Sequence, residues 1–279
     1  MFNTFNYNSK VFNTQGFAVS LADVDDIIFN DYGLQNTDIV TQILIQDSTP
    51  DRDFGVSAVP RGDGQIITGD FWRRKNIQIK GVIHKSTNAL LEAELDAMKK
   101  ALAVAEGILD VKIAGVTRRY IATLTNGQNM FDERKGYHVT FCPFQAEFVS
   151  CEPYGKSVDY NASGFLATSS LVLNEEVTNS GTVHAKPVVI LNLTAANSVT
   201  AISFKNNTTG EEIKVTMSLN AGDYLKFDSE QMEVTVNGVV QDYTGSFPSL
   251  ATGANSFTIT VTGTSCTYDL TVKHKTPYL

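Results

Sequence analysis

Strict alternation of apolar and polar residues recurs in the second half of this 279-residue chain and limits its fold more than any other feature. The apolar members of three such runs are Ile213, Val215, Met217 and Leu219, then Met232, Val234 and Val236, then Phe257, Ile259 and Val261. Successive side chains of a strand point to opposite faces, so each run predicts a strand with one buried face. Asn237-Gly238 favours a tight hairpin turn, because both residues tolerate a positive φ. The second half is therefore predicted to be a β-sandwich that holds or binds a partner.

Length and charge limit the possible classes of function. A chain of 279 residues can bury a large core and favours two domains over one. Its formal net charge of −8 argues against general affinity for nucleic acid, whose phosphates require excess Lys and Arg. No long apolar run predicts a membrane span, and the first residues lack the basic and apolar blocks of a secretion signal. We expect a protein made in a cytoplasm and not bound to a membrane.

Residue usage changes near position 150. All the arginines and Trp72 precede it, whereas Thr, Ser, Asn and Val dominate after it. Pro and Gly within 151–155 favour a break at that point. We predict two domains, residues 1–150 and 151–279.

The first domain is predicted to be mainly β with a single helix. Residues 76–80 and 137–141 alternate as short strands. Between them, apolar residues recur at spacings of four and three, as on one face of a helix: Leu91, Leu95, Met98, Leu102 and Ala105. Thr87 or Asn88 can cap the start of this helix, and Gly107 lies just past its expected end. We expect the helix to cover one side of a sheet.

Residues that could carry chemistry do not converge along the sequence. The four histidines are far apart, and no spacing typical of metal ligands, nucleophile elbows or phosphate loops occurs. Three cysteines at irregular spacing form no disulfide framework. The acidic clusters at 23–26 and 47–53 lack the residue order of a calcium loop and favour solvated turns. We predict no catalytic residue, no cofactor and no metal site, and hence a protein that is not an enzyme.

An ordered set of turn and strand motifs resembles the siphophage distal tail protein family. In the first half these are the Val-Pro-Arg-Gly-Asp-Gly turn at 59–64, the aromatic-Arg segment 71–74 and the Ile-x-Ile strand 77–81, with 5–8 and 16–19 resembling the family's first hairpin. In the second half they are Gly181 and the segments 185–187, 206–210, 221–223, 227–228, 236–238 and 253–255. This second set resembles the family's galectin-like C-terminal domain. The resemblance covers nearly the whole chain.

The resemblance implies an N-terminal β-sandwich with one α-helix, followed by a C-terminal galectin-like β-sandwich. It implies a virion protein of the tail tip, synthesised in the host cytoplasm, whose N-terminal domain forms a homo-hexameric ring. This ring would be the baseplate hub that joins the tail tube protein to the tail-associated baseplate or fibre protein. The C-terminal domains would project outward, where a receptor-binding protein attaches. Genomic DNA would pass through the ring without specific binding.

Arg73 and Arg74 are the candidate interface residues. We expect them side by side on one strand, where they would face opposite ways. One could then pair with a carboxylate of a neighbouring subunit while the other faces water or the ring's lumen. Two surface arginines without a special role are the alternative interpretation.

A carbohydrate-binding adhesion module that recognises a host cell-wall saccharide is the alternative function. Sugar sites commonly use Trp and Arg, and the second domain contains neither. Tyr224, Tyr243 and Tyr268 remain as candidate sugar-stacking residues. For protein partners, we expect the exposed turns at 206–210 and 245–249 to be contact points.

Overall fold

The computed structural model describes residues 24–35, 39–43, 49–59, 63, 65–113, 115–127, 130–131 and 140–279. The chain divides into two compact units, residues 1–155 together with Leu279, and residues 156–278. The motifs at 5–8 and 16–19 lie outside the described residues, as do most of the turn at 59–64 and of the predicted strand at 137–141. The mainly β fold class with one α-helix is confirmed for the described part of the chain.

The first unit is built on a large antiparallel sheet. Its neighbouring strands follow the order β2-β1-β7-β8-β9-β6-β3. The bounds are β1 (Val24–Phe29), β2 (Tyr32–Gly33), β3 (Ile39–Ile43), β6 (Lys75–His84), β7 (Gly107–Ile113), β8 (Val116–Leu124) and β9 (Phe141–Ser150). The predicted strand at 76–80 is confirmed within β6, where Ile77 and Ile79 are buried and Asn76 and Lys80 are exposed.

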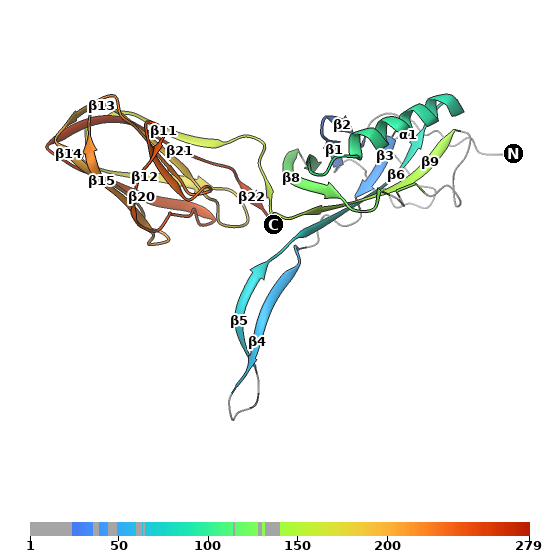
Figure 1. Ribbon diagram of the computed structural model, residues 1–279, viewed down its shortest axis with the longest axis horizontal. Coiled ribbons are helices and arrows are strands. Elements are labelled where there is room, and N and C mark those ends of the chain that lie inside the picture. The colour runs from blue at the N-terminus through green and yellow to red at the C-terminus, as the bar shows by residue number, and fades with distance from the viewer. Residues whose placement is uncertain are drawn as a thin grey trace. The chain divides into compact units, whose positions relative to one another are not determined.

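Helix α1 (Asn88–Leu102) covers one face of this sheet (Figure 1). Its buried residues are Leu91, Leu95, Met98 and Leu102, which belong to the same core as the inward side chains of the strands. Thr87 is the N-cap, and its hydroxyl accepts a hydrogen bond from the backbone N–H of Leu90 at 3.4 Å. The predicted helix, its cap at Thr87 and four of the five residues of its apolar stripe are therefore confirmed. The described residues place this helix, and not a second large sheet, against the buried face of the strands.

The strands β4 (Arg52–Ala58) and β5 (Gln65–Trp72) pair with each other as a two-stranded sheet separate from the large sheet (Figure 1). Their connection at 59–64 is described only at its first residue and at Asp63. We call residues 52–72 the arm.

The second unit consists of two antiparallel sheets. The six-stranded sheet has the order β11-β21-β13-β16-β17-β18, and the five-stranded sheet has the order β12-β20-β14-β15-β19. The bounds are β11 (Asn161–Thr168), β12 (Val172–Asn179), β13 (Val188–Asn197), β14 (Val199–Asn206), β15 (Glu212–Leu219), β16 (Tyr224–Asp228), β17 (Glu233–Val236), β18 (Val239–Val240), β19 (Thr244–Gly245), β20 (Gly253–Thr262) and β21 (Ser265–His274). Two short strands, β10 (Gly155–Lys156) and β22 (Pro277–Tyr278), complete the described elements.

Both sheets contribute to one apolar core, as a β-sandwich requires. Phe204 and Phe257 from the five-stranded sheet stack with ring centroids 4.6 Å apart, and they share this core with Leu191 and Leu270 of the six-stranded sheet. The predicted strands near 213–219 and 257–261 are confirmed as β15 and β20. The inward residues of β20, Phe257, Ile259 and Val261, are all buried.

Turn chemistry in the second unit follows the sequence closely. Asn237 and Gly238 have φ values of 51° and 79° between β17 and β18, so the predicted hairpin is confirmed. Gly245 has a φ of 95°, and an added Cβ would lie 2.1 Å from the carbonyl oxygen of Glu212, so only glycine fits there.

Four expectations about individual residues are wrong. Arg73 and Arg74 lie in the connection between β5 and β6 and not on a strand. Ala105 lies beyond the end of α1 and is exposed, because the helix stops at Leu102. Gly107 starts β7 instead of ending the helix; an added Cβ would lie 2.4 Å from the ring of Phe29, so this glycine allows close packing. Met232 precedes β17 with a φ of 53° and is exposed.

Candidate assembly hairpin

The arm exposes apolar side chains along both of its strands. Five large apolar residues have relative exposures between 49% and 70%: Phe54, Val56, Ile66, Ile67 and Phe71. By contrast, the strands of the large sheet bury one face in the core. A two-stranded hairpin with no buried face is only marginally stable in water. These exposed apolar side chains make the arm a candidate contact surface.

The strand register places these apolar residues beside one another. Val56 is paired with Ile67, so two exposed β-branched side chains share one face of the hairpin. Ile66 and Ile67 are adjacent in sequence and therefore point to opposite faces, which gives the hairpin apolar character on both sides. This adjacent pair is a signal that could have located the arm from sequence, because a strand with one wet face would alternate.

The root of the arm is held by ion pairs and backbone hydrogen bonds. Arg73 pairs with Asp53, and Nε of Arg74 lies 3.0 Å from Oδ2 of Asp51. The N–H of Asp51 donates to the carbonyl of Arg74 at 2.9 Å, and the N–H of Arg73 donates to the carbonyl of Asp51 at 2.7 Å. Both candidate interface arginines thus have carboxylate partners within their own chain. A role for them between subunits stays a prediction.

Arg52 and Asp70 form a second contact across the same root. The guanidinium donates two hydrogen bonds to the carboxylate and lies 5.0 Å from the centre of the Trp72 ring. The hydrogen bond from Arg52 lowers the pKa of Asp70, and the same contact raises the pKa of Arg52. Both side chains are exposed, so the contact orients the arm more than it stabilises the fold.

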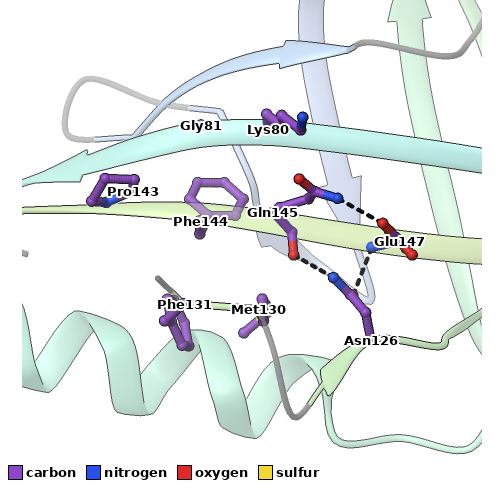
Figure 2. A pocket seen from close by; sticks show the side chains of 9 residues that line it. All are labelled: Lys80, Gly81, Asn126, Met130, Phe131, Pro143, Phe144, Gln145 and Glu147. Atoms are coloured by element: carbon purple, nitrogen blue, oxygen red, sulfur yellow. Dashed lines mark hydrogen bonds between the residues drawn. The ribbon is translucent and has the colours of Figure 1, made fainter. Parts of the chain in front are cut away.

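A pocket of about 590 Å³ lies elsewhere in the first unit, beside β6 and β9 (Figure 2). Its lining consists of Lys80, Gly81, Asn126, Met130, Phe131, Pro143, Phe144, Gln145 and Glu147. Oε1 of Glu147 accepts hydrogen bonds from the side-chain amides of Gln78 at 2.7 Å and Gln145 at 2.6 Å. The side chain of Asn126 donates to the carbonyl of Gln145 and accepts from the N–H of Glu147. These polar groups hold the walls together, and we assign no chemistry to the pocket.

The acidic clusters do not form a cation site in the part of the chain that is described. Asp51 and Asp53 are each paired with an arginine, while Asp23 and Asp47 lie outside the described residues. Within the described ranges, no group of three or more His, Cys, Asp or Glu side chains gathers as metal ligands. No described helix is long and apolar enough to cross a membrane.

Some of the candidate contact residues of the second unit are exposed and others are buried. Tyr224 and Tyr243 are exposed, but Tyr268 is completely buried and donates to the carbonyl of Ser170 at 3.2 Å, so it cannot stack on a sugar. Asn206, expected in an exposed turn, is also completely buried. Its side-chain amide donates to the carbonyl of Ser249 at 2.5 Å, which joins the two turns that we expected to be contact points.

Comparison with known proteins addresses the second unit directly. Residues 180–278 match the model of a family described as the siphovirus-type tail component, C-terminal domain. This range lies within the second unit, which is similar to that tail-component family over these residues. The resemblance drawn from the sequence motifs is thereby confirmed. The matched range contains the motifs from Gly181 to 253–255 on which the resemblance rested in this half of the chain.

The fold of this chain is similar to that of a solved phage protein. The crystal structure of the Dit (gp 19.1) protein of phage SPP1, described as a paradigm of the hub adsorption apparatus in phages that infect Gram-positive bacteria, has a TM-score of 0.65 and 14% identity. The match covers 90% of this chain and 98% of that one. The baseplate of phage P2 in its activated conformation with Ca has a TM-score of 0.39 and 9% identity over 88% of this chain and 92% of that one. No curated protein sequence matches the chain.

Proposed function

We propose that this protein is the distal tail hub of a siphophage. In this proposal the first unit forms a homo-hexameric ring at the tail tip, and the ring joins the tail tube protein to the tail-associated baseplate or fibre protein. The second unit docks a receptor-binding protein, and genomic DNA passes through the ring without specific contacts. Support comes from the tail-component family of the second unit and from a fold similar to that of a hub protein.

The arm is the observation that carries the ring. A ring needs two different surfaces on each subunit, so that every subunit binds one neighbour and is bound by the other. The arm supplies one such surface, because its apolar side chains are exposed on a hairpin that pairs with no other strand among the described residues. The described path of the large sheet ends at β2 and β3, and open strand edges of this kind are natural partners for a neighbouring subunit.

The net negative charge of the chain suits a ring through which DNA passes better than a protein that binds DNA. The formal net charge of −8 repels phosphates, so DNA could pass without being retained. Arg52, Arg73 and Arg74 are each paired with an aspartate at the root of the arm, so these three described arginines form no free basic cluster.

Assembly of the purified full-length protein tests the proposal. We expect native mass spectrometry or light scattering at high concentration to give a six-fold mass. The double variant Ile67→Ser, Phe71→Ser should shift the equilibrium toward monomer by at least about tenfold, because two exposed apolar contacts are removed. The matched control is Val239→Ser, Val240→Ser, which removes two valines that are 63% exposed on the edge strand β18. This control should assemble normally.

Virions provide the decisive measurement. The protein should be found at the tail tip in a copy number divisible by three, whether or not the isolated chain assembles in dilute solution. Absence from the tail tip, or a copy number that is not a multiple of three, would overturn the ring. Equal loss of assembly in the arm variant and the β18 control would overturn the role of the arm alone.

A further inference from the structure

Two lysines converge on one exposed aromatic ring at the edge of the six-stranded sheet of the second unit. Lys273 and Lys275 are two residues apart on or just beyond β21, and their side chains alternate with the buried residues Val272 and His274. Their ammonium nitrogens lie 5.1 Å and 5.2 Å from the centre of the Tyr160 ring. Tyr160 immediately precedes β11, which pairs with β21 (Figure 1). We call these three residues the Lys-Tyr-Lys cluster.

The charges of this cluster are not neutralised within the described residues. Neither lysine has a carboxylate at ion-pair distance there, whereas Lys156 pairs with Glu230 and Lys226 pairs with Asp228. The sheet register places Val188 between Lys273 and Asp228, so Asp228 is the acidic residue two strands away in the same row. Its carboxylate is already used by Lys226 at 2.7 Å and by the N–H groups of Glu230 and Gln231.

The cluster stands out because its surroundings are acidic. Residues 156–278 contain seven lysines and no arginine against eleven aspartates and glutamates. Two unneutralised ammonium groups at one point therefore form a local positive spot on a negative domain. Tyr160 as a residue is 46% exposed, so the part of its side chain that the lysines do not cover can be reached beside these charges.

We propose that the Lys-Tyr-Lys cluster binds an anionic saccharide, meaning a sugar that carries a carboxylate or a phosphate. The two ammonium groups suit an anion held between them, because charge-assisted hydrogen bonds are stronger than neutral ones. The exposed part of the tyrosine ring suits the C–H face of a sugar, as aromatic rings do at interfaces with one apolar and one wet side. A nucleic acid is disfavoured, because the acidic domain would repel its dense line of phosphates. The site does not depend on ring assembly.

Affinity electrophoresis of the full-length protein tests this site. The gels contain polygalacturonate, phosphorylated dextran, neutral dextran or duplex DNA, and retardation gives the affinity for each polymer. We expect retardation by one or both of the acidic saccharides but not by neutral dextran. Lys273→Gln, Lys275→Gln should lower that affinity by about tenfold or more. Tyr160→Phe should retain it, and Tyr160→Ala should lower it several-fold.

The matched control is Lys186→Gln, Lys205→Gln, which changes the net charge equally at two exposed lysines outside the cluster. It should bind as the unchanged protein does. An equal loss in this control would show that net charge alone is measured, and absence of retardation by both acidic polymers would overturn the site. Stronger retardation by DNA would reassign the cluster to nucleic acid. Ring assembly, measured separately, should be the same in all four variants, so failure of this proposal is distinct from failure of the hub.

Discussion

The arm and the C-terminal sandwich are both antiparallel β structure, yet they treat apolar residues in opposite ways. In the sandwich, the inward residues of β20 are buried in a core shared by two sheets. In the arm, Phe54, Ile67 and Phe71 are each more than half exposed. The same residue types therefore serve internal stability in one region and remain available for an external contact in the other. Among the described residues, a second sheet covers the strands of the sandwich, whereas the arm is a two-stranded sheet of its own.

The largest difference in stability is expected between two substitutions on helix α1 of the first unit, one buried and one exposed. Leu95→Asp places a charge where the side chain is only 4% exposed, and should destabilise the unit by about 3–5 kcal/mol. Leu90→Asp, on the same helix but 52% exposed, should leave stability nearly unchanged. Calorimetry of the full chain measures both. If Leu95→Asp melts normally and fails only in assembly, then the helical stripe is an interface and the buried core described above is wrong.

Truncating one phenylalanine in each region, Phe257 in the sandwich and Phe71 in the arm, compares the two regions directly. Phe257→Ala removes a ring stacked on Phe204 in the sandwich core and should cost about 3–5 kcal/mol. Phe71→Ala in the arm should change the free energy of unfolding by about 0.5 kcal/mol or less, because that ring is 70% exposed. Denaturant unfolding gives both values. A large loss for Phe71→Ala would mean that the arm packs on its own chain.

The buried side chain of His274 should make the stability of the sandwich depend on pH. Among the described residues, neither of its ring nitrogens has a hydrogen-bond partner, and burial lowers its pKa below the ordinary value of 6.5. The unfolded chain therefore takes up a proton below pH 6.5 that the folded chain resists, so stability is full above pH 6.5 and falls as the pH drops below it. The melting temperature should decrease between pH 7.5 and 5. His274→Leu should remove this part of the decrease, whereas His184→Leu, at an exposed position, should not.

Local patterns predicted much of the fold for identifiable reasons. Period-two alternation located β15 and β20, spacings of three and four located α1, and Asn237-Gly238 located a hairpin, because each pattern is set by neighbours in sequence. The errors came from long-range contacts. Gly107 looked like a helix terminator, but the ring of Phe29 from another strand determines why glycine is there.

The candidate sites were harder to predict than the fold. Arg73 and Arg74 were singled out from sequence, but their aspartate partners become neighbours only when β4 pairs with β5. The Lys-Tyr-Lys cluster joins residues more than 110 positions apart through the pairing of β11 with β21, so no local pattern could locate it. Asn206 shows the reverse case, since turn chemistry suggested exposure while the fold buries its amide.

The smallest expected effect on stability comes from the contact between Arg52 and Asp70 at the root of the arm. We expect its loss to change the orientation of the arm but not the stability of the fold. The contact with Arg52 lowers the pKa of Asp70, so the ion pair is complete above the ordinary value of 3.8 and is lost as the pH falls through the lowered pKa of the folded protein. Asp70→Asn removes the carboxylate at neutral pH. Because both partners are exposed, we expect no measurable change in the global melting temperature.

The chain's only tryptophan, Trp72, lies beside Arg52, so its fluorescence reports on this root. Its emission should change on acidification below about pH 4 in the unchanged protein, and the same change should be present at pH 7 in Asp70→Asn. A normal arm signal in Asp70→Asn at neutral pH would show that the backbone contacts between Asp51, Arg73 and Arg74 alone hold the arm in place.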